Sequence, residues 1–471
     1  MRRWAWAVGV VALTGCTVGP HYEPPQAALP SQWRADQGHG NFDTHGWTQL
    51  GDPQLDRLVE QVAASNLDLQ LAANRLAQSR LVRTISAGDR LPTLSGQASY
   101  SRERNSGEGL NDPSGRAGQA PFELWTLAAD ASWEVDLWGR VRRQIEAADA
   151  QVDVSQAERN GLLLSLTAEA ASDYLQLRGV QAQLAVTRQN LDIAQRSQAL
   201  TQSRFDNGVT TQLDVANAAA QVATISARLP VLDAQQARLI NALSALLGQP
   251  PRTLQAELIE PKPLPTPDEA IALGVPSELA RSRPDIQRSE AALHRAVAAT
   301  GAAQADFYPR LTLGASVGKQ ALGGSDLGDW GARDWSYGPS LYLPIFQGGR
   351  LTGTLALREQ EQQAAAIDYR RTVLAAWHEV DNALIDAAAE RQHQQALAQA
   401  VSQNERGLAV ARQRYQEGAI DFLNVLNVQR ALLETQSAQV SSATQRLLNQ
   451  VQLYKALGGG WPSNANMGTL P

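Results

Sequence analysis

Side chains that could catalyse a reaction or hold a metal do not gather into a recognisable site in this sequence. None of the six histidines lies three or four positions from another, the spacing that places two imidazoles on one face of a helix. His378 precedes Glu379 but has no second histidine at helical spacing, which is typical of solvated surface. Asp386 and Glu390, four positions apart, are typical of an exposed helix face. The sequence therefore predicts no catalytic site, no metal site and no bound cofactor.

Cys16 is the one residue whose surroundings indicate a covalent reaction. It is the only cysteine, so the chain can form neither an internal disulfide nor a cysteine-based metal site. It follows a basic pair, Arg2-Arg3, and an apolar stretch from Trp4 to Leu13, an order typical of an export signal. The end of this stretch resembles a bacterial lipobox, in which the cysteine is diacylated and becomes the mature N-terminus. We predict a lipoprotein signal peptide over 1–15 and a covalent lipid on Cys16; a plain secreted protein with an incidental cysteine is the alternative.

Composition narrows the class of partner. The formal net charge is −6, and no run of Lys or Arg is longer than two residues, which argues against nucleic-acid binding. Charged residues make up 19% and aromatic residues 6% of the chain, and Ala, Gln and Leu are abundant. That mixture favours extended helices with small side chains at their contacts. No stretch after residue 15 approaches the roughly 20 apolar residues that a membrane-spanning helix needs.

Two long helical hairpins, expected at 138–247 and 348–457, are versions of one unit. The same features recur 210 positions later in the second hairpin, at its start (348 against 138), its break (415 against 205) and its end (457 against 247). An offset held over such a length excludes insertions within the unit and indicates that the length itself matters. About 65 residues of helix at 1.5 Å each would reach about 100 Å. The sequence thus predicts two internal structural repeats.

Turn signals divide each hairpin into two arms. Gly208 and Gly418 suit the left-handed conformation that ends helices. Thr211, with Asp214 three residues on, predicts a capping box at the start of the first return arm. Pro230, inside that arm, predicts a bend. Apolar residues in the first arm step by three, four or seven positions, which gives a narrow contact seam rather than a broad globular face.

Four shorter stretches alternate apolar with polar residues and carry Trp or Tyr. They predict strands at about 93–102, 124–136, 310–319 and 335–344. The remaining boundaries follow from Pro- and Gly-rich segments. We expect a lipidated N-terminal tether at 16–50, a first repeat at 51–248, a Pro-rich crossover at 249–267, a second repeat at 268–458 and a flexible tail at 459–471.

The alternating strands leave two structural interpretations. One is a pair of hairpins packed on the helices and exposed to solvent. The other is part of a transmembrane β-barrel, which the lipobox favours. Open sheet edges cannot lie in lipid, and about eight strands make the smallest closed barrel. Four strands in one chain would therefore need at least one more chain, and three chains would give twelve strands around a wider, water-filled lumen.

Three motifs resemble one family, and the resemblance covers nearly the whole mature chain. They are the segments 18–25 after the lipobox, 134–140 and 344–350. The chain resembles the outer membrane factors of the TolC superfamily, in the OprM- and NodT-like lipoprotein branch. That resemblance implies an α+β membrane protein. Its homotrimer would have a 12-stranded transmembrane β-barrel, with four strands from each chain, continued by a long periplasmic α-helical barrel.

The resemblance also implies partners and a location. The partners would be a periplasmic adaptor protein, also called a membrane fusion protein, and an inner-membrane pump of the proton-driven RND type. The expected location is the outer membrane, with the lipid anchor in the membrane and the helices extending into the periplasm. Thr17, rather than an aspartate, follows the cysteine, which agrees with an outer-membrane anchor. Protein secretion fits this lipid-anchored branch less well than the efflux of drugs or other small molecules.

Two sites follow from the resemblance. The helix turns that contain Phe205 and Gly208, and Tyr415 and Gly418, would meet the adaptor; ordinary turns without a partner are the alternative. The stretch 421–430 resembles the segment that gates the periplasmic end, where a leucine, an aspartate and an arginine hold the helices closed. Leu423 and Arg430 match this pattern. The sequence has Asn427 where the family has the aspartate, and Asp421 could supply a carboxylate instead.

An amide at position 427 cannot form a charge-assisted pair with Arg430, the stronger kind of hydrogen bond. The expectation is a closed state held by hydrogen bonds and by packing of Leu423, with weaker cation selectivity than in relatives that have an aspartate. For the whole protein, an export duct competes with a structural or adhesive coiled-coil lipoprotein that has no lumen. The amphipathic strands favour the duct, because a tether between envelope layers has no need of them.

Overall fold

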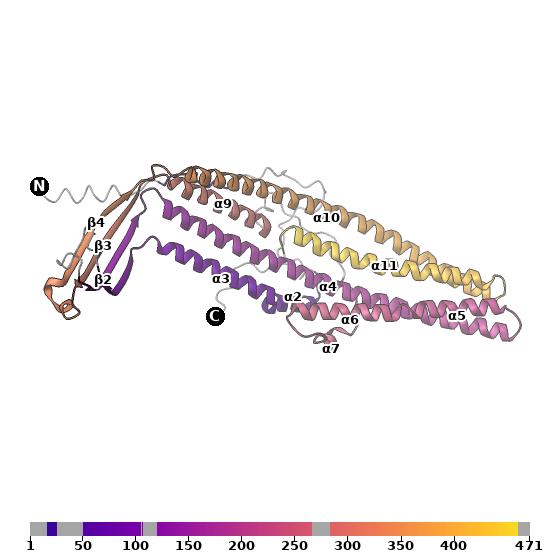
Figure 1. The fold of residues 1–471 in the computed structure, drawn as a ribbon. Helices are drawn as coiled ribbons and strands as arrows, with labels where there is room; N and C mark the ends of the chain where they lie inside the picture. Colours follow the sequence, from indigo (N-terminus) through magenta and orange to yellow (C-terminus); the bar gives the residue numbers. More distant parts are fainter. Residues whose placement is uncertain (1–16, 26–49, 105, 107–119, 266–282, 460–471) are drawn as a thin grey trace. The chain divides into compact units, whose positions relative to one another are not determined.

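The computed structural model describes residues 17–25, 50–104, 106, 120–265 and 283–459 (Figure 1). The predicted signal peptide, Cys16, most of the predicted tether, most of the loop after the first strand, the start of the predicted second repeat and most of the tail lie outside these residues. Two compact units can be distinguished. The first draws on Met1–Pro25, Leu76–Ser155 and Arg288–Tyr369, and the second on Gln26–Arg75, Gln156–Gln287 and Arg370–Pro471. Both units therefore combine segments from the two halves of the sequence.

Four antiparallel strands form one sheet in the first unit. They are β1 (Thr93–Glu103), β2 (Phe122–Val135), β3 (Arg310–Ala321) and β4 (Arg333–Tyr342), in the spatial order β1-β2-β3-β4. The predicted strands are confirmed, and their observed ends differ from the predicted ones by at most two residues. Two short 3-10 turns, η2 (Asp326–Gly328) and η3 (Trp330–Ala332), lie between β3 and β4. Because the strand order follows the sequence order, β1 and β4 are the two edges of the sheet.

The remaining elements described by the structure are helices. In chain order they are α2 (Pro53–Ser65), α3 (Leu67–Gly88), α4 (Arg140–Asp206), α5 (Gln212–Ser226), α6 (Leu229–Leu246), α7 (Gln255–Leu258), α9 (Pro284–Ala305), α10 (Arg350–Gln416) and α11 (Phe422–Ala456). The two long arms, α4 and α10, each contain 67 residues. The return arm of the first hairpin is broken between α5 and α6, just before Pro230, as predicted. The return arm of the second hairpin, α11, is continuous.

The core of the second unit surrounds Arg178, whose side chain is fully buried. Its guanidinium donates hydrogen bonds to Gln54 Oε1 at 2.7 Å, Gln181 Oε1 at 2.6 Å and the Glu260 carbonyl oxygen at 2.9 Å. Its Cζ lies 4.7 Å from the centre of the Tyr174 ring, and the Tyr174 hydroxyl bonds to Asp52 Oδ2 at 2.5 Å. A buried charge is tolerated only when such partners replace water. This network therefore ties α2 and the segment after α7 to α4.

Close packing elsewhere in this unit depends on a glycine. A Cβ atom on Gly179 of α4 would lie 2.4 Å from Thr444 Oγ1 of α11. No side-chain carbon can approach an oxygen so closely, so only glycine lets the two helices pack at this distance. Gly179 thus has the same effect as the small residues expected at tight helix contacts.

Residues 17–25 pack against the helices of the first unit. The Val18 amide donates to the Trp138 carbonyl oxygen at 3.1 Å, just before α4 begins. Gly19 has a φ of +94°, and a Cβ atom there would lie 2.6 Å from Gly301 Cα of α9. The Tyr22 ring stacks on His294, with ring centres 4.2 Å apart, and its hydroxyl donates to Glu290 Oε1 at 3.0 Å. This part of the predicted tether is therefore held along α4 and α9.

Asp173 of α4 should make the stability of the protein depend on pH. Burial, together with nearby Glu169, raises its pKa from 3.8 to about 6. Because the folded chain binds this proton more tightly than the unfolded chain does, stability should fall as the pH rises from about 4 to about 6. Asp173→Asn removes the carboxyl group and, with it, this loss of stability at higher pH. We expect the variant to unfold at a higher temperature than the wild type at pH 8, with little difference at pH 4, in thermal melts followed by circular dichroism.

Glu158→Gln is the matched control, since Glu158 lies on the exposed face of the same helix. Glu158→Gln should leave the difference between the unfolding temperatures at pH 4 and pH 8 the same as in the wild type. Equal pH dependence in Asp173→Asn and in the wild type would contradict the assignment.

Candidate functional surfaces

The register of the sheet places the alternating residues of all four strands on two chemically distinct faces. Directly opposed residues of an antiparallel ladder point to the same side, and Tyr100 opposes Trp125, Ala129 opposes Val317, and Val317 opposes Trp335. The large residues of this face are Leu94, Tyr100, Trp125, Leu127, Trp133, Leu311, Leu313, Val317, Trp335, Tyr337 and Leu341. We call it the apolar sheet face.

The other face is mostly polar, apart from Phe122, Leu124 and Tyr342 near its ends. It carries Ser95, Gln97, Ser99, Thr126, Asp130, Ser132, Ser316, Gln320, Ser336 and Ser340. The apolar sheet face has no cover in the described structure: Leu94 is 79% and Tyr337 is 78% exposed. Large apolar side chains on a water-soluble sheet would normally be covered. The exposed apolar sheet face therefore requires an apolar environment or partner to cover it.

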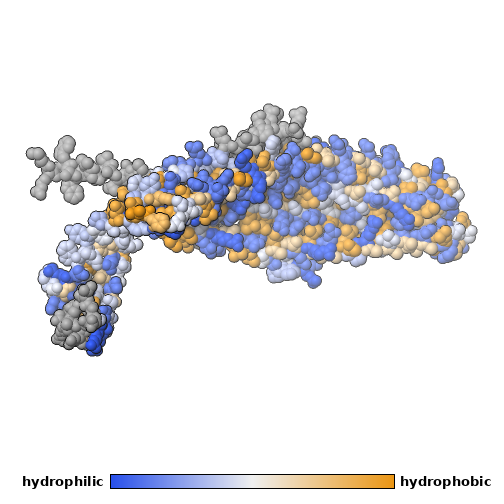
Figure 2. All heavy atoms as spheres, turned by 45° about the horizontal axis from the view of Figure 1, so that its top comes forward, coloured by the Kyte–Doolittle hydropathy of each residue, from blue (hydrophilic) through white to orange (hydrophobic). Residues whose placement is uncertain are grey.

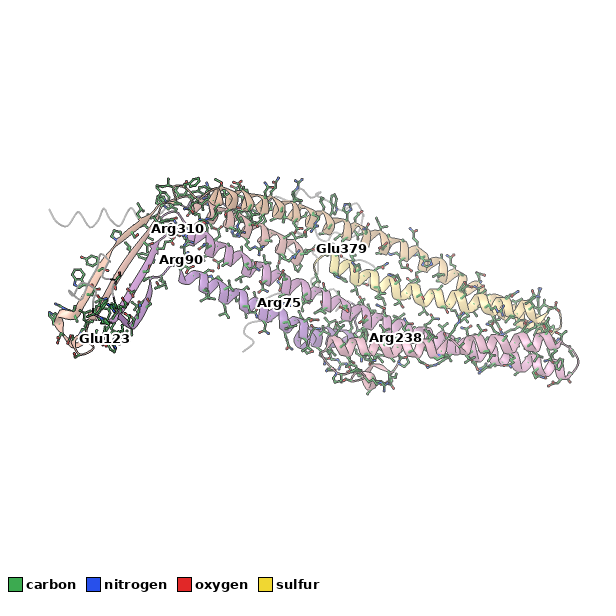
Figure 3. All side chains as sticks on the ribbon, in the orientation of Figure 1. Arg75, Arg90, Glu123, Arg238, Arg310 and Glu379 are labelled. Carbon is green, nitrogen blue, oxygen red and sulfur yellow. The ribbon has the colours of Figure 1, made fainter. Side chains whose placement is uncertain are left out.

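Charged residues end the apolar sheet face near the hairpin loops, where Arg102 opposes Glu123 and Lys319 opposes Arg333. At the opposite end of β3, on the polar face, Arg310 bonds to Asp306 Oδ1 at 2.5 Å. Figure 3 labels Glu123 and Arg310 at the two ends of the sheet. Beyond β4, the exposed residues Leu343, Ile345 and Phe346 lead into α10, and Figure 2 shows apolar side chains gathered at this end of the first unit.

A Gly-x-Ser-x-Gly sequence, found in many hydrolases at the turn between a strand and a helix, occurs at Gly314–Gly318. Here it lies wholly inside β3, where Ser316 opposes Asp130 of β2. The strained turn that would expose a nucleophile is therefore missing. Within the described ranges, no cluster of three His, Cys, Asp or Glu residues could hold a metal ion. None of the helices in those ranges is long and apolar enough to cross a membrane.

Both helix tips end in the same glycine motif. Gly208 has a φ of +74° and Gly418 a φ of +76°, so both predictions of a left-handed glycine are confirmed. In the first tip the amides of Gly208 and Val209 donate to the carbonyl oxygens of Phe205 and Arg204, each at 2.8 Å. The second tip repeats this pattern at positions 418 and 419, at 3.0 and 2.9 Å. These paired bonds satisfy the last carbonyls of α4 and α10.

The two tips begin their return helices differently. The predicted capping box is confirmed: the Thr211 side chain accepts from the Asp214 amide at 3.3 Å, and the Asp214 carboxylate accepts from the Thr211 amide at 3.2 Å. Asp421 holds the equivalent position before α11, but its side chain makes no capping hydrogen bond. The carboxylate of Asp421 is therefore exposed and not engaged with its own helix.

Arg204 joins the first tip to the second. Its Cζ lies 4.7 Å from the centre of the Tyr415 ring, and its Nη1 donates to the Gln416 carbonyl oxygen at 3.2 Å. Tyr415 is only 4% exposed and packs against Phe422, with ring centres 5.6 Å apart. Of the residues predicted to meet an adaptor, the two glycines are exposed, whereas Tyr415 supports its turn from inside. No local feature of the sequence predicts this contact, because Arg204 and Tyr415 are far apart in the chain.

The predicted gate residues share the exposed side of the first turns of α11. Leu423 is 54% exposed, and Asn427 and Arg430 are also exposed, while Phe422, Val425 and Leu426 between them are buried. Arg430 Nε donates to Gln221 Oε1 of α5 at 3.0 Å. No hydrogen bond joins Arg430 to Asn427 in the described part of the chain. The polar partner of Arg430 is therefore an amide on the neighbouring hairpin.

Cys16 lies outside the described residues, but the next residue is placed. A Cβ atom on Gly139, which has a φ of +82°, would lie 3.1 Å from Thr17 Cα. The chain therefore emerges beside the start of α4, close to the end of β2. A lipid on the preceding cysteine would have its attachment at this end of the sheet.

Comparisons with known proteins agree with this arrangement. The chain matches the family model described as outer membrane efflux protein over residues 58–249 and 275–459. It is 33% identical to the outer membrane protein OprJ of Pseudomonas aeruginosa, with 99% of this chain and 98% of OprJ aligned. It is 30% identical to the solvent efflux pump outer membrane protein SrpC of Pseudomonas putida, with 97% and 98% aligned. Its fold is similar to that of the outer-membrane channel OprN, with a TM-score of 0.90 and 34% identity over 95% of this chain and 100% of OprN.

These matches confirm the resemblance that the sequence motifs indicated, and they confirm the predicted outer-membrane location. They also identify the general function as efflux, which is transport rather than catalysis. The structural match covers the sheet and the long helices together. The chain belongs to the outer membrane efflux protein family.

Proposed function

We propose that three copies of this chain form the outer-membrane exit duct of a tripartite efflux system. The duct passively passes drugs or other small molecules. A proton-driven inner-membrane pump of the RND class delivers them through a periplasmic adaptor. The observation that carries this proposal is the apolar sheet face, exposed on all four strands and backed by a polar face. Lipid on one side and water on the other is the environment that such a sheet requires.

The open edges of the sheet supply the stoichiometry. Backbone groups along β1 and β4 cannot remain unpaired in lipid, so each edge must pair with another copy. Two copies would give eight strands, whose interior side chains can fill. Three copies give twelve strands, and the small residues of the polar face would then line a water-filled lumen. The lipid proposed on Cys16 would add a second anchor.

The apolar sheet face is long enough to cross much of the outer membrane. On β3 it runs from Leu311 to Val317 and ends at Lys319. At about 3.3 Å per residue this is about 20–25 Å along the strand, on the scale of the apolar band of outer-membrane barrels, which is about 25 Å tall. Aromatic residues lie near its loop end, where the Tyr100 and Trp125 rings are 4.5 Å apart. Aromatic girdles of this kind border the hydrocarbon region.

The alternative is a structural or adhesive lipoprotein whose helices bridge envelope layers without a lumen. Its long helices would serve that purpose equally well. A bridging protein would have no need of an exposed apolar sheet face, however, and it would leave the gate residues of α11 without a role. The family match also favours efflux over adhesion.

A charge placed on one face of β3 should therefore have a different effect from the same charge on the other. Ala315 lies on the apolar sheet face between Ala131 and Tyr337, and Ser316 is the next residue, on the polar face. Ala315→Arg should destabilise the barrel by about 2–4 kcal/mol, the cost of arginine near the middle of the membrane. We expect a strong loss of the heat-modifiable trimer band from outer-membrane extracts.

Ser316→Arg is the matched control, because it adds the same side chain one residue away. It should leave trimer yield near that of the wild type and lower the cation conductance in planar bilayers. Equal trimer yields for the two variants would mean that both faces contact water and would exclude the barrel. A wild-type protein that is monomeric and shows no conductance would refute the duct itself.

The gate proposal predicts the effect of restoring a carboxylate at position 427. Asn427→Asp should draw Arg430 away from Gln221 of the first hairpin and into a charge-assisted pair within α11 itself. Such an exposed pair contributes about 0.5–1 kcal/mol and competes with the bond that links the two hairpins, so we expect closed intervals roughly two- to fivefold shorter, with a stronger cation preference. Single-channel recordings in planar bilayers measure both quantities.

Combining Asn427→Asp with Arg430→Gln separates the pair from the added charge. The double variant should keep part of the cation preference but show the same closed intervals as Arg430→Gln alone. If Asn427→Asp changes neither quantity, the proposed gate is wrong, although the duct could still conduct.

A further inference from the structure

A cavity of about 280 Å³ opens between α4 and α10 near the two tips. Its base is formed by buried side chains, Tyr415, Phe422 and Val425. Its more exposed lining includes two arginines, Arg196 of α4 and Arg412 of α10. We call it the tip cavity. The cavity thus combines an apolar base with two guanidinium groups. Neither arginine belongs to the gate residues or to the turn motifs.

Only one of the two arginines is paired with a carboxylate in the described part of the chain. Arg196 pairs with Asp192 at 2.8 Å, one helical turn away on α4. Arg412, which is half-buried, forms no ion pair in the described part of the chain, and its Nη2 donates only to the Ile193 carbonyl oxygen at 3.4 Å. Burial, and then the nearby charge of Arg196, lower the pKa of Arg412. The tip cavity therefore has a surplus of positive charge at a partly desolvated position.

This surplus selects the chemistry of a ligand. A guanidinium group presents donors in a planar fork that fits a carboxylate, and hydrogen bonds between two charged groups are stronger than neutral ones. The apolar base suits the methylene groups that join a carboxylate to a backbone. Aspartate and glutamate side chains combine both features.

The position of the tip cavity indicates where that side chain comes from. Tyr415 and Gln416 are the last residues of α10 before the second turn, and Phe422 is the first residue of α11 after it. The cavity thus adjoins the turn that the proposed function assigns to the adaptor. We propose that the tip cavity binds an aspartate or glutamate side chain of the periplasmic adaptor, with Arg412 as its main contact. This inference rests on the proposed function.

Site-specific cross-linking in cells tests the proposal with the full-length chain. A photoreactive p-benzoylphenylalanine replaces Gln416, an exposed residue of the cavity wall, and in a second strain it replaces Val209, which is 61% exposed at the first tip. We expect the probe at 416 to cross-link to the adaptor, at a peptide that contains an acidic residue when sequenced by mass spectrometry. Trimer yield is checked in each strain by the heat-modifiable band.

Charge changes at Arg412 then identify the contact. Arg412→Glu should lower the yield of the 416 adduct by about tenfold, while Arg412→Lys should lower it less, since lysine keeps the charge but loses the fork. Arg406→Glu is the matched control, because Arg406 is an exposed arginine on the same helix outside the cavity lining. It should leave the yield unchanged. Replacing the acidic residue of the adaptor by arginine should restore the adduct in the Arg412→Glu strain, because the two opposite charges are then exchanged.

Other outcomes overturn the proposal. An adduct at 416 with a second copy of this chain, or one that Arg412→Glu does not reduce, would show that no adaptor carboxylate enters the tip cavity. If the probe at 209 captures the adaptor but the probe at 416 does not, the inference fails while the proposed function stands. If neither probe captures it in cells that assemble the trimer, the adaptor docking in the proposed function fails as well.

Discussion

The equal length of α4 and α10 is the constraint on which the rest of the chain depends. Each has 67 residues, and the return arms that follow also end 210 positions apart, at Leu246 and Ala456. One inserted residue would turn the end of either helix by about 100° and move it by about 1.5 Å. The hydrogen bond from Arg204 to the Gln416 carbonyl oxygen could not survive that change. The two tips can brace each other only because both arms keep the same residue count.

Within that constraint the two hairpins are stabilised differently. The first tip is closed by local hydrogen bonds, because Thr211 and Asp214 cap α5. The second lacks a side-chain cap at Asp421 and depends on packing, with Tyr415 and Phe422 buried beside Arg204. Local caps hold a turn in place whatever its neighbours do, whereas packing against a neighbouring hairpin can be exchanged. The start of the first return arm is therefore fixed by its own residues, whereas the start of the second depends on contacts beyond its own turn.

Much of the fold could be predicted from the sequence because its signals are local. Glycines at helix ends, a Thr and an Asp three residues apart, and strict alternation along the strands each depend on neighbouring residues. The alternation within each strand predicts its apolar positions, and the register places these positions of all four strands on one face. These features fixed the ends of the hairpins and the chemistry of the sheet.

The contacts that complete the sites could not be predicted in this way. Arg178, read alone, is a charged residue of a helix and would be expected at the surface, yet partners from distant segments make its burial possible. The same holds for Arg430, whose partner Gln221 belongs to the other hairpin, and for Val18, which bonds to Trp138. Sequence spacing carries no information about such pairs. Even the match of Arg430 to a gate motif could not identify the group that Arg430 contacts.

The tip cavity and the gate are connected through one helix. Phe422 and Val425 form part of the cavity base, while Leu423 and Asn427 lie on the exposed side of the same turns of α11. A helix turn is rigid, so displacement of the buried residues would also move the exposed ones. Arg430 adds a second connection, because its bond to Gln221 links the same helix to the first hairpin. A side chain entering the tip cavity would therefore act on the helix that carries the gate, without touching the gate residues themselves.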